Sequence, residues 1–349
     1  MYKRQRLALD EAVAYFRGVG DRRGEGRAIH ALSDFVGNTG GDGPESRALA
    51  LAATELATES RDNLTGPLAH GRVAIADWVA GRDEEARERL ATALRLAEAS
   101  GDPHAVANSH HLLGVFWFNR SQWAASESHL RLAEGSGVSA FTRYFRAEIA
   151  VHLGDFPSAL AQLDRLADRI ASGHLPGRHS ALVQFGRGSV ARLEGRTEMA
   201  CACFREVLAT EMATNEPWFE QHSLVGLAMM DGTASVDGSA RDHLARALSL
   251  DPDGNSRHSP LPAVVAAVAE LVVETDAERG ALIWAMASRL GNRAWFRPMY
   301  PQDVARISEL VDQAREAHGI PVPDVPADLT AADAIAQCIA ALASLEHHQ

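Results

Sequence analysis

The chain has 349 residues, a formal net charge of −12 and only 6% aromatic residues. An acidic chain repels phosphate backbones, so direct nucleic-acid binding is not expected. No apolar run approaches the roughly 20 residues of a membrane span, and no signal-peptide pattern lies near the start, which predicts a cytoplasmic protein without a membrane partner. The three cysteines, Cys201, Cys203 and Cys338, do not make a disulfide framework.

The first residues differ in composition from the rest of the chain. Lys3 is the only lysine, against 33 arginines. We therefore interpret residues 1–6 as a non-native or scar segment. Ala12, Phe16 and Val19 then fit the second helix of a repeat that has no first helix before it. A fragment that lacks its N-terminal neighbour is the favoured interpretation, and a capping helix is the alternative.

A small apolar signature recurs about every forty residues. Its three members are spaced four and three apart in the expected second helix of each unit, and they are Ala86, Leu90 and Ala93; Ser126, Leu130 and Ala133; Ala159, Leu163 and Leu166; Ala200, Phe204 and Val207; and Ala240, Leu244 and Ala247. A fixed period of this size indicates a repeat protein. Stacked repeats offer a long concave binding face.

Gly-Asp and Gly-Arg pairs separate the amphipathic stretches, as expected where one helix ends and the next begins. They predict helix pairs at residues 22–36 with 44–58, 65–80 with 83–99, 103–119 with 122–133, 139–153 with 157–170, 179–194 with 197–213, and 217–230 with 238–250. Further helices are expected at residues 263–273, 277–290, 304–318 and 331–345. Two prolines and three aromatic residues lie in residues 293–301, and Thr330 with Asp333 makes a capping box for the last helix. We expect repeats over residues 7–262 and an atypical C-terminal repeat with capping helices over residues 263–349.

Motifs for catalysis and for metal binding are not found. A P-loop needs a lysine that reaches the phosphates, and Lys3 cannot supply it, so ATP would bind only through a module outside this sequence. Cys201 and Cys203 are two apart on a helix and face opposite sides, so they cannot chelate one metal together. The stretch Asp251–Asn255 lacks the glycine and glutamate of an EF-hand and is interpreted as a helix-ending turn. No catalytic residue, cofactor or metal is predicted, and we do not expect an enzyme.

The order of small and aromatic residues resembles that of tetratricopeptide repeats. One unit shows Leu113-Gly114, Trp117, Ser126, Leu130 and Ala133, and a later unit adds Pro252 five residues after Ala247. The resemblance implies an all-α fold, a right-handed α-solenoid of helix-turn-helix repeats, although most units run near 40 residues rather than the family's roughly 34. The longer units, with residues 15–27 and 277–343, are similar to the helical sensor region of large bacterial signal-transduction ATPases (STAND-type, LuxR/SARP-like) that regulate transcription.

This resemblance implies a function in binding. The chain would be the ligand- or partner-binding arm of a bacterial transcriptional regulator, and the alternative is a free-standing adaptor that scaffolds protein–protein interactions. The expected partner is a protein or peptide, or a small-molecule effector. In tetratricopeptide repeats the first helix of each pair lines the concave face, and the register of Gly114, Ala147 and Gly188 then assigns that face to Trp78, Asn108, His111, Phe118, Tyr144, Glu148, Phe185 and Arg192. Packing of Phe118, Tyr144 and Phe185 between adjacent units is the alternative.

Overall fold

The computed structural model describes residues 2–40, 43–135, 140–210, 217–231, 239–252, 259–292 and 296–345. Within these ranges there are 17 α-helices, one short 3-10 helix and no β-strand, which confirms the predicted all-α class. The chain divides into two compact units, the first made of residues 1–142 with 255–257 and the second of residues 143–254 with 258–349. The division falls inside one helix, α8.

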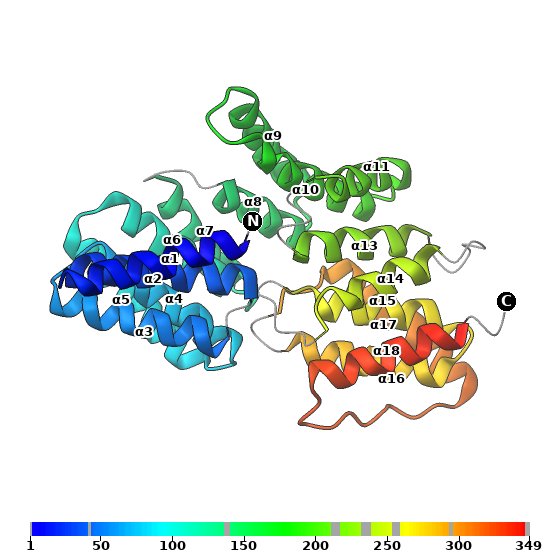
Figure 1. Ribbon diagram of the computed structural model, residues 1–349. Helices are drawn as coiled ribbons and strands as arrows, with labels where there is room; N and C mark the ends of the chain where they lie inside the picture. Colours follow the sequence, from blue (N-terminus) through cyan, green and yellow to red (C-terminus); the bar gives the residue numbers. More distant parts are fainter. Residues whose placement is uncertain are drawn as a thin grey trace. The chain divides into compact units, whose positions relative to one another are not determined.

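The first unit consists of consecutive helices that pack in pairs. The helices are α1 (Tyr2–Gly18), α2 (Arg22–Gly40), α3 (Pro44–Glu59), α4 (Thr65–Val79), α5 (Asp83–Ser100), α6 (Pro103–Phe118), α7 (Trp123–Gly135) and the start of α8 (Ala140–His152). The pairs α2 with α3, α4 with α5, and α6 with α7 are those that the sequence predicts. Figure 1 shows the helices of this unit, coloured from blue to cyan.

The second unit continues this pattern and then departs from it. After α8 come α9 (Phe156–Ala171), η1 (Gly177–His179), α10 (Ser180–Leu193), α11 (Thr197–Leu208), α13 (Pro217–Asp231), α14 (Ser239–Ser249), α15 (Leu261–Val273), α16 (Ala277–Gly291), α17 (Pro301–His318) and α18 (Ala331–Ser344). Helices α14, α16, α17 and α18 all pack on α15, whose buried side chains belong to a core shared with α13. The proposed cap over residues 263–349 therefore shares its core with α13 and α14, and its boundary stays a prediction.

Burial of the apolar signature explains why the pairs form. Every signature residue is buried. In the first helix of a pair, a small residue makes room for the signature residue of the second helix. A Cβ atom added at Gly114 would lie 2.6 Å from the Leu130 side chain, and one added at Gly188 would lie 3.0 Å from Phe204. Interiors packed this closely do not absorb an added methyl group without strain.

The turns and caps follow the local sequence signals. The glycines at positions 20, 81, 101, 154 and 195 all have φ between 69° and 75°, a conformation that suits glycine at the end of a helix. The Thr330 hydroxyl accepts from the Asp333 amide, and the Asp333 side chain accepts in return, which confirms the predicted capping box.

Two expectations concern residues at the N-terminus and residues beyond the described ranges. Helix α1 begins at Tyr2, inside the proposed scar segment, and Arg6 donates to Glu45 at 2.5 Å; whether residues 1–6 are native stays a prediction. Asp253 and Asn255 of the interpreted helix-ending turn lie outside the described residues.

Within the described part of the chain, no helix has the length and apolarity needed to cross a membrane. The right-handed sense of the solenoid stays a prediction.

Candidate functional site

Four of the eight expected binding residues lie in the first unit. The buried Trp78 ring of α4 packs edge-on against Phe116 at 5.8 Å between ring centroids, and the buried Phe118 ring packs in the same way on Trp123 at 5.4 Å. His111 Nδ1 lies 3.0 Å from the hydroxyl of Thr142, and Asn108 is half-buried. These side chains take part in separate contacts between neighbouring helices.

The other four expected residues lie in the second unit, where two neighbouring helices bring them together. Tyr144 and Glu148 are one turn apart on α8, and Phe185 and Arg192 are two turns apart on α10, so each pair shares a helix face. The rings of Tyr144 and Phe185 lie 6.3 Å apart, and all four side chains are buried. We call these four residues, together with Trp218 of α13, the receiving face.

A segment from the C-terminal part of the chain contacts the receiving face. This clasp segment consists of residues 296–303. Residues 296–300 have no regular structure, and Pro301 begins α17. Arg297 donates to the hydroxyl of Tyr144 at 2.8 Å and to Oε2 of Glu148. The Tyr300 hydroxyl donates to the same Glu148 oxygen at 2.9 Å. The Arg297 and Glu148 side chains are only 1% and 0% exposed, so this ion pair is removed from water.

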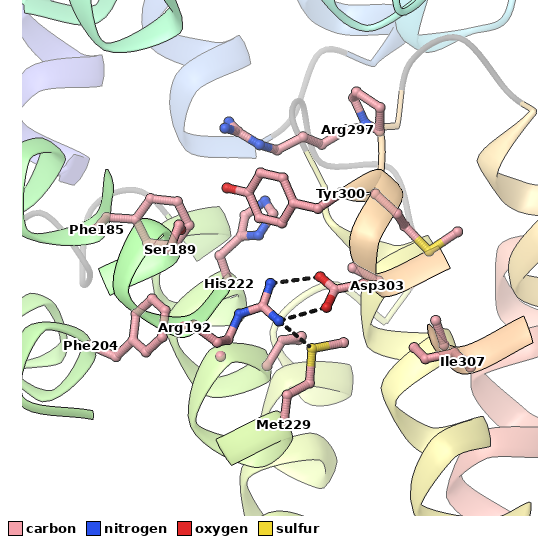
Figure 2. A pocket seen from close by; sticks show the side chains of 16 residues that line it. Phe185, Ser189, Arg192, Phe204, His222, Met229, Arg297, Tyr300, Asp303 and Ile307 are labelled. Atoms are coloured by element: carbon pink, nitrogen blue, oxygen red, sulfur yellow. Dashed lines mark hydrogen bonds and ion pairs between the residues drawn. The ribbon is translucent and has the colours of Figure 1, made fainter. Parts of the chain in front are cut away.

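A second ion pair joins the clasp segment to α10. Arg192 donates from Nη1 to Oδ1 of Asp303 at 2.7 Å and from Nη2 to Oδ2 at 2.6 Å. Figure 2 shows this two-bonded contact, with Met229 next to the same guanidinium. Two parallel bonds between a guanidinium and a carboxylate fix the orientation of both groups. The clasp segment is thereby held at both ends, by Arg297 and by Asp303.

Burial determines the charge state of the site. Burial, reinforced by the nearby Glu148 charge, raises the pKa of Tyr300, and burial also raises the pKa of Tyr144, so both hydroxyls hold their protons and can donate. Burial alone would lower the pKa of Arg297, but Tyr144 and Glu148 outweigh it and raise that pKa. Burial and the Arg297 charge lower the pKa of His152, whose ring lies 4.8 Å from that of Tyr300, to about 3.

A small cavity lies beside the second ion pair, in the second unit. Arg192, Asp303, Tyr300 and Phe185 line it together with mostly apolar side chains, and the half-buried His222 and Met229 lie on its wall (Figure 2). Its volume is about 30 Å³. Since one water needs roughly 10–15 Å³ on this measure, the cavity has room for about two waters. While the clasp segment contacts the receiving face, the cavity therefore has room for small polar groups and not for a larger ligand.

Arg297, Tyr300 and Asp303 were not among the expected binding residues. They follow the end of the repeat pattern, so the register that found the other residues does not reach them. A signal was present nonetheless. Glu148 lies on the interior face of a helix, and a buried carboxylate needs a cationic partner, which in this chain must be an arginine because lysine occurs once.

Comparison with known proteins shows similarity of structure and not of sequence. No family model matches the chain, and no curated protein sequence matches it. Among solved structures, a tetratricopeptide repeat protein from Parabacteroides merdae ATCC 43184 is similar, with 12% sequence identity and a TM-score of 0.45. The alignment covers 82% of this chain and 98% of that protein. Within the described ranges, no group of three or more His, Cys, Asp or Glu residues is placed to hold a metal ion.

Proposed function

We propose that this chain is a binding protein, the ligand- or partner-binding arm of a larger bacterial regulator of transcription, and that the receiving face holds the partner. The chemistry of the face supports binding. Its Arg192 and Glu148 pair with opposite charges of the clasp segment, and its Tyr144 keeps its proton. Charged side chains and protonated hydroxyls form the ion pairs and hydrogen bonds that orient and hold a polypeptide.

One observation carries this proposal. The receiving face already holds a segment of polypeptide that has no regular structure, the beginning of the clasp segment. The buried Arg297–Glu148 pair holds this irregular part, and a second buried pair, Arg192 with Asp303, holds the first turn of α17 that follows it. A face that binds one segment in this way has the donors, acceptors and aromatic walls to bind another.

Regulation would then operate by population shift. In the released state the clasp segment has left the receiving face. A partner that binds only this state increases its population, by an amount that its differential affinity for the two states determines. Because the seated state leaves a cavity for only about two waters, an effector of ordinary size would also bind the released state. The two kinds of ligand would therefore act in the same direction.

Capture of partners from cells that make the protein tests this proposal. His222 lies against the Phe185 and Trp218 rings of the receiving face, and Met229 accepts from Arg192. Replacement of His222 and Met229 by alanine should therefore reduce the amount of a specific partner recovered by at least about tenfold, the usual size of effect at a hot spot. Charge reversal at Asp164 and Glu206, which are exposed on the second helices α9 and α11, is the control and should have little effect. Equal losses in both variants would contradict binding at the receiving face.

A free-standing adaptor is the second candidate. Leu7 and Tyr15 are exposed on α1 and Val19 is exposed directly after it, and their spacing of eight and four residues places them on one side. Such an apolar face favours contact with further protein, which suits an arm joined to other modules and an adaptor alike. The mass of the native protein, detected by antibody in its own cells, separates the two. An arm predicts a mass well above 37.5 kDa, and an adaptor predicts that value.

A further inference from the structure

The clasp segment contains a short proline motif. Pro298 and Pro301 are three residues apart, and Arg297 directly precedes the first of them. Proline fixes its own φ and keeps the preceding residue extended. Tyr300, which precedes the second proline, has φ −65° and ψ 134°, values close to those of a polyproline II helix. The clasp segment therefore contains an arginine and Pro298 in an irregular stretch that ends with the extended Tyr300, and Pro301 then begins α17.

The receiving face has the two features that recognise such a segment. Aromatic rings surround the Arg297 guanidinium, with the Trp218 ring centroid at 5.3 Å and the Tyr144 centroid at 5.4 Å from its central carbon. Glu148 supplies the carboxylate. Polyproline II segments dock into aromatic-lined grooves, and a guanidinium over aromatic rings gains further attraction. The receiving face thus surrounds the Arg297 guanidinium as a groove surrounds the arginine of a peptide ligand.

We infer that the partner of the receiving face is a protein segment with an arginine directly before a P-x-x-P motif, and that the clasp segment is an internal copy of this ligand that competes with it. This inference rests on the proposed binding function and names the partner's chemistry. The guanidinium is the selective element, because a partner without it would leave the Glu148 carboxylate buried and unpaired. Lysine lacks the planar guanidinium that lies against the Tyr144 and Trp218 rings.

Competition from within the chain sets the apparent affinity for the partner. The partner binds only the fraction of molecules whose face is released, so its apparent dissociation constant rises as that fraction falls. The tether to α17 keeps the clasp segment at a high effective concentration. A change that weakens the clasp segment without altering the receiving face should therefore tighten binding of the partner.

The test uses a fluorescent peptide with the sequence of residues 296–306 and the full chain. Arg297→Ala in the chain removes the internal guanidinium and leaves the receiving face intact. By fluorescence anisotropy, the peptide should bind this variant at least about tenfold more tightly than the wild-type chain. Arg187→Ala is the matched control, because it removes a surface arginine of the same unit that pairs with Asp164, and it should bind the peptide as the wild type does.

Two altered peptides test the recognition chemistry. One carries Arg297→Ala, and the other carries Pro298→Ala with Pro301→Ala; each should bind the Arg297→Ala chain at least about tenfold more weakly than the unaltered peptide. Ethylguanidinium, which mimics the missing side chain, should raise the thermal midpoint of the Arg297→Ala chain and not that of Arg187→Ala. If the Arg297→Ala chain does not fold, Tyr300→Phe takes its place, because it removes one bond to Glu148 and keeps the ion pair.

Each result separates the inference from the proposed function. Equal affinity of the wild-type chain and the weakened chain would overturn the internal competition. Equal affinity of the altered and unaltered peptides would overturn recognition of arginine and prolines, while binding of segments by the receiving face would stand. Failure of every peptide to bind a folded, weakened chain would overturn the whole inference, and the capture experiment with the His222 and Met229 variant would still decide the proposed function.

Discussion

The two units of the chain use arginine–carboxylate pairs in different ways. In the first unit some pairs join positions about one repeat apart, such as Arg27 with Asp62, 35 residues away, and Arg47 with Asp77, 30 residues away. Arg27 and Arg47 remain partly exposed. In the second unit Arg297 reaches Glu148 across 149 residues and Arg192 reaches Asp303 across 111 residues, with both partners buried.

Pairs of the first kind join neighbouring repeats, and pairs of the second kind join a repeat helix to the clasp segment. A pair that spans one repeat joins neighbours that already pack together, and a partly hydrated arginine gains little from it. A pair buried at both ends has lost its hydration, so each member depends on the other. The first unit should therefore tolerate loss of a partly exposed charge such as that of Arg27, and the second should not tolerate loss of a buried charge such as that of Glu148.

The largest effect should follow Glu148→Gln. The substitution keeps the size of the side chain but leaves the Arg297 guanidinium buried without a counter-charge, and the free energy of unfolding should fall by about 3–5 kcal/mol. Urea unfolding measures it. The double variant with Arg297→Met should recover much of the loss, because it removes the unpaired charge. A loss below about 1 kcal/mol for the single variant would place this pair with those of the first unit.

A pH effect should also distinguish the second unit. The pKa of His152 is about 3 in the folded chain, against roughly 6.5 when unfolded, so the unfolded state binds the extra proton between these values. Stability is therefore lost as the pH falls through this window, by about 2 kcal/mol from pH 7 to pH 5. Arg297 and Tyr300 face the imidazole. The variant His152→Gln should lose less stability than the wild type over the same range.

Asp62 of the first unit provides the contrast in pH. Burial would raise its pKa, but hydrogen bonds from Arg27, Thr65 and the Leu64 amide outweigh burial and lower the pKa to about 2. A carboxyl group with a lowered pKa contributes stability above its unfolded pKa of about 3.9 and loses it only as the pH falls toward 2. Asp62→Asn should therefore leave the change in the free energy of unfolding between pH 7 and pH 5 unaltered. A smaller change in this variant than in the wild type would contradict the lowered pKa of Asp62.

A smaller effect is expected from overpacking a repeat. Ala200 is fully buried between the helices of its pair, and Ala200→Leu should lower the free energy of unfolding by roughly 1–3 kcal/mol. Ala202→Leu, exposed on the same helix, is the control and should change it little. An unchanged urea midpoint for Ala200→Leu would show that the register of this pair is wrong.

The smallest effect should follow Arg27→Ala in the first unit. Its guanidinium is about half exposed, so loss of the bonds to Asp62 should lower the free energy of unfolding by no more than about 1 kcal/mol, and less at high salt. Thermal unfolding at low and high salt measures it. A loss as large as that of Glu148→Gln would remove the distinction between the two kinds of pair.

The helices and their pairing could be read from the sequence because their signals are local. A glycine such as Gly154 ends a helix within one turn, and a signature residue such as Leu163 meets the helix next to its own. The same register placed Tyr144, Glu148, Phe185 and Arg192 on adjoining faces. It could not supply Arg297 or Asp303, because their partners lie 149 and 111 residues away, beyond the end of the repeats.

The aromatic residues show a second limit of the register. It assigned Trp78 and Phe118 to an open face, yet both are buried against other rings within the first unit. A periodic pattern identifies the side of a helix that faces its neighbours. Whether that side is open depends on how far large rings fill the space between helices, which the spacing of residues does not encode.

The direct junction of the clasp segment with α17 has a mechanical consequence. Pro301 is the first residue of an 18-residue helix, and Asp303 lies in its first turn. A helix of that length extends about 27 Å and behaves as a stiff rod. A displacement of the seated segment by a few ångströms is therefore expected to tilt the whole rod and to move His318 at its far end further than the segment itself. An event at one buried carboxylate would in this way become a movement at a remote surface, with α17 as its lever arm.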